Sequence, residues 1–149
     1  MEVTGTVHSV LARKGSAVSS ISPDATVYEA VARMAEEDIG ALAVIENRRL
    51  AGIFSERDYA RKVILLGRSS KDTKVSEAMT HPAVCVLPEE SVEDCMRLMS
   101  ARRNRHVLVL DRGELCGIVS IGDLVNWIIS AQAETIDHLT NYIAGSYPR

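Results

Sequence analysis

The sequence predicts a mixed α/β fold in which two tandem β-α-β-β-α repeats pack about a pseudo-two-fold axis. Three observations lead to this prediction. Residues 20–64 align without a gap on residues 85–129, with ten identical positions at a constant offset of 65. Valine and isoleucine gather in short runs typical of strands, while alanine and methionine recur at helical spacing. Aromatic residues make up only 4% of the chain, so aliphatic side chains must form most of the core.

Each copy is expected to begin with a short strand and a helix. The strands are predicted at residues 18–21 and 84–87, each followed by a turn that contains a proline. The helices are expected to begin at Thr26 and Ser91, whose hydroxyl groups suit the N-cap position. The first helix has apolar residues at the i, i+3, i+4, i+7 spacing of a buried face. These residues are Val27, Ala30, Val31 and Met34.

Two further strands and a second helix complete each copy. The strands are predicted from the runs ALAVI and AGIF in the first copy, and from HVLVL and CGIV in the second. Polar turns at residues 46–49 and 111–114 separate the strands of each pair. The second helix is expected to begin at Ser55 in the first copy and at Ser120 in the second. So short a unit cannot bury both of its faces alone, which is why we expect the two copies to pack together.

Three segments lie outside the repeated part. Residues 6–14 predict a helix that ends at Gly15, and the apolar spacing beyond residue 129 predicts a last helix that continues to about residue 144. This extension would either dock on its own chain, which we favour, or pair with a second chain. The expected organisation is a first repeat with its N-terminal helix (1–66), a polar linker (67–74), a second repeat (75–130) and a C-terminal helix extension (131–149).

Composition and charge argue against several classes of function. The chain has 17 basic and 20 acidic residues and no basic stripe, so it lacks the electrostatic footprint of a nucleic-acid-binding protein. Its apolar runs are far shorter than the roughly 20 residues that a membrane-spanning helix needs. The first residues lack the pattern of a signal peptide, and the three cysteines have no paired spacing. We therefore expect a cytoplasmic protein that binds neither nucleic acid nor membrane.

One motif, G-I-x-S-x-x-D, occurs at the same place in both copies, at residues 52–58 and 117–123. Serine followed by aspartate three positions later is typical of a capping box, worth about 1 kcal/mol to a helix. Its recurrence after a glycine, where a ligand could approach the backbone, favours nucleotide binding as well. Free N–H groups at a helix N-terminus suit phosphate, and a carboxylate can accept hydrogen bonds from both hydroxyl groups of a ribose.

The whole pattern resembles the CBS-domain pair, also called a Bateman module, over nearly all of residues 6–129. The stretches NRHVLV, IGALAV, ERDYARKVILLGRSSKDTKV and VSIGDLV are similar to those of stand-alone CBS-pair proteins, which have no catalytic domain attached. The resemblance implies two clefts between the copies for adenosyl ligands such as AMP, ATP, NAD(H) or S-adenosylmethionine. Each cleft takes its aspartate from one copy and the strand that faces the adenine from the other.

Transferred to this sequence, the resemblance implies that one cleft contains Ser120 and Asp123, with Arg105 and His106 in reach of the phosphates. Its adenine wall would come from residues 18–21 and 39–41. The residues of this wall that we assign to the nucleotide are Val18, Ser19, Ile21, Ile39, Gly40 and Ala41.

The other cleft would contain Ser55 and Asp58, with Asn104 and residues 84–86 beside the adenine. Its positions that match Arg105 and His106 carry no charge, although Arg57 lies next to Asp58. We therefore expect the cleft of Asp123 to bind more tightly. A dinucleotide would place its adenosine there and extend toward Arg57.

These features predict a regulatory module without catalytic residues, catalytic cofactor or metal. The sequence contains no glycine-rich nucleotide loop, no nucleophile elbow and no cluster with zinc-like spacing. The leading hypothesis is a sensor of energy or redox state, in which an adenine nucleotide changes the arrangement of a homodimer that a partner protein then reads. The alternatives are a structural or oligomerisation scaffold that binds no nucleotide, and an enzyme that uses the cleft for hydrolysis or transfer. The sequence does not choose between AMP, ATP and NAD(H).

Overall fold

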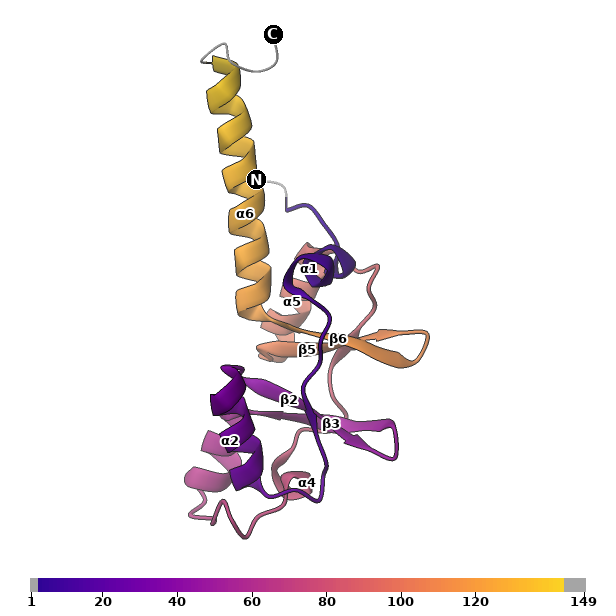
Figure 1. Cartoon of the computed structure of the whole chain (residues 1–149), viewed down its shortest axis with the longest axis vertical. Helices are drawn as coiled ribbons and strands as arrows, with labels where there is room; N and C mark the ends of the chain where they lie inside the picture. Colours follow the sequence, from indigo (N-terminus) through magenta and orange to yellow (C-terminus); the bar gives the residue numbers. More distant parts are fainter. Residues whose placement is uncertain (1–2, 144–149) are drawn as a thin grey trace.

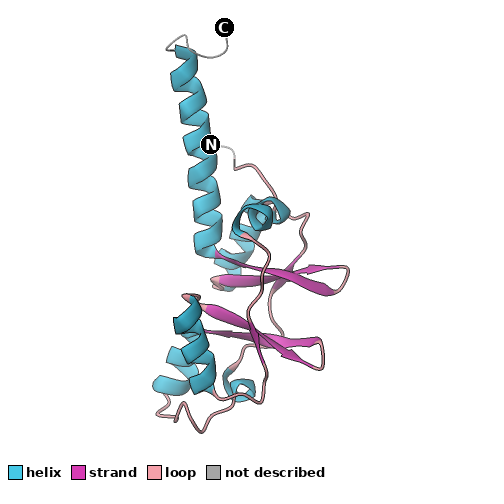
Figure 2. Cartoon of the chain, in the orientation of Figure 1, coloured by secondary structure: helices cyan, strands magenta, loops and turns pink. Residues whose placement is uncertain are grey.

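The computed structural model describes the backbone of residues 3–143 and the side chains of residues 3–134. Two three-stranded sheets lie in the middle of the molecule, and helices cover the outer side of each sheet (Figure 1, Figure 2). The layers therefore follow the order helix, sheet, sheet, helix. This arrangement confirms the predicted mixed α/β fold of two tandem repeats.

The first copy follows the predicted order of strands and helices, and Thr26 caps its first helix by accepting a hydrogen bond from the N–H of Glu29. In its sheet, β1 pairs in parallel with β2, which pairs antiparallel with β3. The second helix continues from a short α-helical turn into a π-helical segment, η1. The elements are β1 (Ser20–Ile21), α2 (Val27–Glu37), β2 (Ala41–Glu46), β3 (Arg49–Ser55), α3 (Glu56–Tyr59) and η1 (Ala60–Ile64).

The second copy repeats this arrangement down to the irregularities of its backbone. A register shift occurs between Val44 and Ile45 in the first sheet and between Val109 and Leu110 in the second, 65 residues later. The elements of the second copy are β4 (Cys85–Val86), α5 (Val92–Arg102), β5 (His106–Asp111), β6 (Glu114–Ser120) and α6 (Ile121–Ile143).

Two helices outside the repeats complete the cores of the two copies. α1 (Val7–Lys14) lies before the first copy in the sequence but packs against α5, α6 and β6 of the second (Figure 1). Its buried residues Val7, Val10 and Leu11 belong to the same core cluster as those of α5 and β5. α4 (Val75–Ala78) lies before the aligned part of the second copy (85–129) and packs in the core of the first, although the expected organisation placed it in the second repeat. Each copy is thus completed by the segment that precedes the other.

The two sheets meet through a small apolar cluster. Its buried members are Ala41, Ala43 and Ile53 from the first copy and Leu108 from the second. Ile53 of this cluster also borders a cleft, together with Ser55 at the end of β3 and His106 at the start of β5. The functional residues lie at this end of the interface.

The last helix is longer than its counterpart in the first copy. The backbone of α6 runs to Ile143, and its second half leads away from both sheets (Figure 1). The predicted end of the helix, at about residue 144, lies outside the described residues. The side chains from residue 135 onward also lie outside them, so the docking of the extension stays a prediction.

Candidate functional site

Both copies of the S-x-x-D motif form capping boxes. In the first copy, the hydroxyl of Ser55 accepts a hydrogen bond from the N–H of Asp58 at 3.2 Å, and the N–H of Ser55 donates to the Asp58 carboxylate at 3.0 Å. Ser120 and Asp123 make the same pair of bonds, at 3.1 and 2.8 Å. The predicted capping role is therefore present in both copies. It holds each aspartate at the start of its helix.

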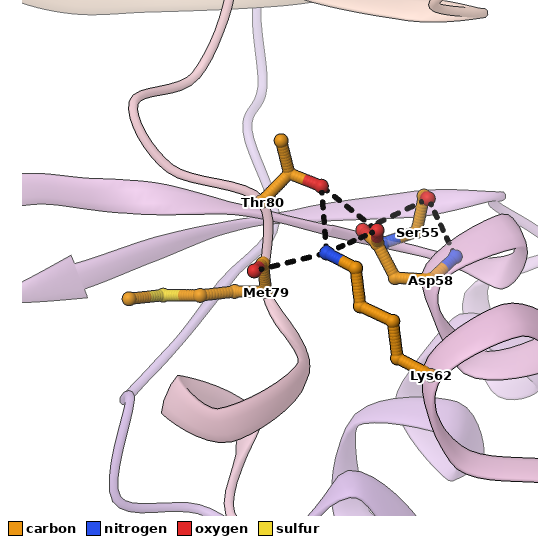
Figure 3. Close-up of polar contacts among 5 residues, drawn as sticks. All are labelled: Ser55, Asp58, Lys62, Met79 and Thr80. Atoms are coloured by element: carbon orange, nitrogen blue, oxygen red, sulfur yellow. Dashed lines mark hydrogen bonds and ion pairs between the residues drawn. The ribbon is translucent and has the colours of Figure 1, made fainter. Parts of the chain in front are cut away.

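Asp58 is also held by two residues that sequence reasoning missed (Figure 3). The hydroxyl of Thr80 donates to Oδ1 of Asp58 at 2.8 Å, and Nζ of Lys62 lies 3.2 Å from the same oxygen. Lys62 donates further bonds to Thr80 and to the carbonyl oxygen of Met79, both at 3.3 Å. Asp58 is only 7% exposed, so these contacts replace most of its hydration. Lys62 stands four residues after Asp58 on the same helix, a spacing that could have revealed it.

A cleft of about 490 Å³ lies beside Asp58, between the two copies. Such a volume is typical of small-molecule sites. The start of the second helix forms one side of the cleft, and the segment that leads into β5 forms the other. The lining residues are Gly40, Ile53, Ser55, Glu56, Arg57, Asp58, Arg61, Thr80, Val84, Arg103, Asn104, Arg105 and His106.

Positive charge predominates around this cleft. Arg57 and Arg61 come from the first copy, and Arg103 and Arg105 come from the second. The guanidinium of Arg57 donates a hydrogen bond to the backbone carbonyl of Arg103, which joins the two copies at the cleft. The only carboxylates among the described lining residues are those of Glu56 and Asp58.

Among the basic residues that line the cleft, His106 is neutral at pH 7. Burial lowers the pKa of its imidazole below the ordinary 6.5, and the nearby arginine and lysine charges act in the same direction. The carboxylates of Asp123 and Glu56 act in the opposite direction but do not outweigh burial. His106 opens β5, where it pairs with Ser120 of β6, so it lies between the two capping boxes.

The structure groups the predicted site residues differently from the sequence. Arg105 and His106 were assigned to the cleft of Asp123, but they line the cleft of Asp58, together with Gly40 and Arg57. The reason is that the segment before β5 faces the first copy across the interface. Asn104 and Val84 lie in the same cleft, where the prediction put them.

The residues predicted for the adenine wall of the other cleft have different neighbours in the structure, and their contact with a ligand stays a prediction. Ile21 is buried in the core of the first copy, and Ala41 is buried between the sheets, where Val18 packs beside it. The hydroxyl of Ser19 donates to the carboxylate of Glu37. Ile39 borders a separate shallow groove along α2. None of these residues lines the cleft beside Asp58.

The carboxylate of Asp123 forms an ion pair with Lys14, which lies 109 positions earlier in the sequence. Nζ of Lys14, in α1, lies 2.6 Å from Oδ2 of Asp123 and 2.8 Å from the carbonyl oxygen of Ile118. Burial favours the protonated form of Asp123, but hydrogen bonds from Lys14 and Ser120 outweigh it, so the pKa of the carboxyl lies below its ordinary value. Which of the two aspartates binds a ligand more tightly stays a prediction.

Other parts of the protein pack closely against the two glycines of the motif, Gly52 and Gly117. A Cβ on Gly52 would lie 2.6 Å from the backbone oxygen of Thr80, and one on Gly117 would lie 2.6 Å from the side chain of Leu11. The close approach expected of a ligand is thus made by the segment after α4 in one copy and by α1 in the other. The absence of a side chain at these glycines therefore allows close packing within the protein.

Neither a metal centre nor a membrane span is found in the part of the chain that the structure describes. No group of three histidine, cysteine or acidic residues there is arranged to hold a metal ion. No helix there combines the length and apolar character needed to cross a bilayer.

Comparisons with known proteins agree with this architecture. The family model described as CBS domain matches residues 15–64 and 75–130. The chain is 40% identical over 151 residues to the CBS domain-containing protein CBSX3, mitochondrial, of Arabidopsis thaliana, with 95% of this chain and 73% of that protein covered. It is 33% identical to the CBS domain-containing protein YhcV of Bacillus subtilis, with 87% and 84% covered. A solved structure of a protein with CBS domains from Burkholderia ambifaria matches at a TM-score of 0.84 and 46% identity, with 86% and 96% covered.

Proposed function

The chain belongs to the CBS domain family, and from this membership we propose that it is a regulatory module that binds an adenine nucleotide in the cleft beside Asp58. One observation carries the proposal: the cleft combines the aspartate of one copy with arginines of the other. A nucleotide in this cleft would touch both copies at once. Its binding would therefore depend on how the two copies are arranged.

The lining residues offer a partner for each part of a nucleotide. The carboxylate of Asp58 would accept hydrogen bonds from the ribose hydroxyl groups, in place of the one that Thr80 now donates. Val84 and Ile53 offer apolar contact to the adenine, and Asn104 offers an amide for its polar edge. Arg105 and Arg57 are placed for the phosphates. AMP, ATP and NAD(H) share the adenosine part and are all candidates.

The cleft of Asp58 is proposed as the principal site, instead of the cleft of Asp123. A ribose that binds Asp123 must first displace the ammonium group of Lys14, which lies 2.6 Å from the carboxylate. At Asp58, the lysine lies farther away, with Nζ of Lys62 at 3.2 Å from Oδ1, and a ribose would displace the neutral hydroxyl of Thr80 from that oxygen. Hydrogen bonds between charged groups are the stronger ones, so displacement costs more at Asp123.

The position of the cleft between the copies supports the proposed regulatory role. A ligand shifts a conformational equilibrium only when it binds one arrangement more tightly than the other. A nucleotide that bridges the copies meets this requirement, and a partner protein would read the arrangement it favours. We propose no catalytic step: Asp58 is committed to hydrogen bonds, and a nucleotide bound in the cleft is expected to stay unchanged over hours.

Self-association is the second part of the proposal. Ile64 and Ile129 occupy equivalent positions in the two copies and are 54% and 58% exposed. Leu65 and Leu66 are 75% and 66% exposed. Several large apolar side chains on one small protein favour contact with another chain, and we propose a homodimer. We keep the cytoplasm as the proposed location.

Isothermal titration calorimetry with AMP, ATP, NADH and S-adenosylmethionine tests the proposal. Asp58→Asn keeps the shape of the side chain and removes its charge. This variant should weaken binding of the tightest ligand by roughly 3 kcal/mol, or more than a hundredfold in affinity, since two hydrogen bonds to a charged group are affected. Asp123→Asn is the matched control and should leave the affinity within a few-fold of the unaltered protein. If no ligand binds even at millimolar concentration, the scaffold alternative replaces the proposal.

A further inference from the structure

Arginines outnumber carboxylates around the cleft beside Asp58. Four arginines line it, against the carboxylates of Glu56 and Asp58, in a chain whose net charge is -3. The charge of Asp58 is already matched, since Lys62 lies 3.2 Å from it and Ser55 and Thr80 donate to it. Glu56 is the only remaining acid in the cleft lining. The cleft is therefore a positive site in an acidic protein.

The four guanidinium groups form no ion pair with an acidic side chain among the described residues. They belong to Arg57, Arg61, Arg103 and Arg105. Arg68 and Arg97, by contrast, each pair with a glutamate on the surface. Arginines without such an ion pair around one cleft are available to an anion.

The four arginines come from both sides of the cleft. Arg57 and Arg61 stand four residues apart on α3 and η1, so their side chains follow one another along one face of the helix. Arg103 and Arg105 flank Asn104 on the facing segment of the other copy. The bond from Arg57 to the backbone of Arg103 brings the two pairs together. Both copies therefore contribute to this set of four cleft-lining arginines, which we call the row of arginines.

We infer that this cleft selects an adenine nucleotide with two or more linked phosphates over a nucleoside monophosphate. The inference rests on the proposed function, because it takes the adenosine part to bind beside Asp58 and Val84. A single phosphate can engage only part of the row of arginines. A second and a third phosphate would reach the remaining guanidinium groups, whose planar forks match phosphate oxygens in pairs. Each further phosphate thus adds charge-assisted hydrogen bonds.

Calorimetric titration with AMP, ADP and ATP, at two salt concentrations and without divalent cations, tests the inference. The affinity should rise at least about tenfold from AMP to ATP, because each added contact between ionised groups contributes about a factor of ten or more. The gain should shrink at high salt, since exposed charges are screened. Arg61→Ala should lower the affinity for ATP about tenfold and the affinity for AMP by less than threefold. Arg61 is exposed, so its removal leaves the core intact.

Arg112→Asn provides the matched control. Arg112 carries the same charge but lies in the turn between β5 and β6, outside the cleft lining. Its positive φ of 53° is one that asparagine tolerates. This variant should bind all three nucleotides like the unaltered protein.

The outcomes separate this inference from the proposed function. Binding of AMP as tight as that of ATP, or an equal loss of both in Arg61→Ala, would overturn the inference and leave the nucleotide site intact. Binding of inorganic tripolyphosphate as tight as that of ATP would show that the adenosine part is not recognised, which overturns both. Absence of binding by all three nucleotides would do the same.

Discussion

The ammonium nitrogen of Lys14 lies 2.6 Å from the carboxylate of Asp123, across 109 positions of the sequence. The repeated aspartate of the first copy also has a lysine beside it, but that lysine, Lys62, comes from its own helix. Each copy of the motif thus has a lysine beside its aspartate, but the two lysines come from different elements of the fold. Under the proposed function, the difference would make the two candidate clefts unequal, because a ribose that binds Asp123 would have to displace Lys14.

Removal of Lys14 should therefore free the second site. In Lys14→Ala, we expect calorimetric titration with ATP to change from about one nucleotide per chain to about two. The fold should persist, since the Lys14 side chain is 31% exposed and such pairs contribute at most about 1 kcal/mol. Lys71→Ala removes the same charge from the surface near Tyr28 and should leave the stoichiometry at one. A stoichiometry that stays at one in Lys14→Ala would refute the competition.

The position of His106 predicts how nucleotide affinity depends on pH. Burial holds the pKa of the free imidazole below 6.5, against the pull of Asp123 and Glu56. A phosphate beside it would raise that pKa, so the complex binds more protons than the free protein, and affinity should rise as the pH falls from about 8 to about 6. Since nucleotide phosphates also titrate in this range, the measurement is the difference in slope between the unaltered protein and His106→Gln. Equal slopes would mean that His106 does not sense the phosphate.

Without nucleotide, His106 should make the folded protein less stable as the pH falls. The folded protein binds the His106 proton less readily than the unfolded chain, because the pKa is lowered on folding. The contribution of His106 to the free energy of unfolding is then lost as the pH falls below about 6.5. Urea unfolding at several pH values should show a smaller loss on acidification in His106→Gln.

The packing of the motif glycines predicts unequal effects of two equivalent substitutions. A Cβ on Gly52 meets the backbone oxygen of Thr80, which is fixed by hydrogen bonds of 3.0 and 2.8 Å with Ile53. A Cβ on Gly117 meets side-chain atoms of Leu11, which can shift more readily than a hydrogen-bonded backbone. Gly52→Ala should lower the free energy of unfolding by about 1–3 kcal/mol, and Gly117→Ala by less. Urea unfolding of both variants measures the difference, and the reverse order would contradict the packing role.

Thr80 offers a way to separate structure from binding at Asp58. In Thr80→Val, the donor of the 2.8 Å hydrogen bond to Asp58 is lost. The free energy of unfolding should fall by about 1 kcal/mol. Affinity for ATP should stay the same or increase, because Oδ1 of Asp58 becomes available to the ribose. A large loss of affinity in this variant would indicate that the ligand needs Thr80 itself.

Much of the fold could be predicted because the sequence is duplicated. The constant offset of 65 residues places Ser55 and Ser120 at equivalent helix starts, and even the register shifts of the two sheets repeat at this offset. Hydrophobic spacing then separates strands from helices within each copy. The packing of α1 on the second copy could not be predicted, because no local pattern states which core an amphipathic helix enters.

The candidate site was harder to predict than the fold. Ser55, Asp58 and Arg57 are neighbours in the sequence, so their proximity follows from one helix turn. The partners Thr80 and Lys14 are 22 and 109 positions from the aspartates they contact. The side of the interface that Arg105 and His106 face depends on how the two sheets pack. These relations arise from tertiary packing, which spacing alone does not encode.

The most direct test of the central claim is the location of a bound nucleotide by amide NMR, for which a chain of 149 residues is well suited. On addition of ATP, the account predicts shifted amide signals at Ser55, Asp58, Val84 and Arg105, with those of Ser120 and Asp123 little changed. Shifts confined to Ser120 and Asp123, or no shifts at saturating nucleotide, would contradict it.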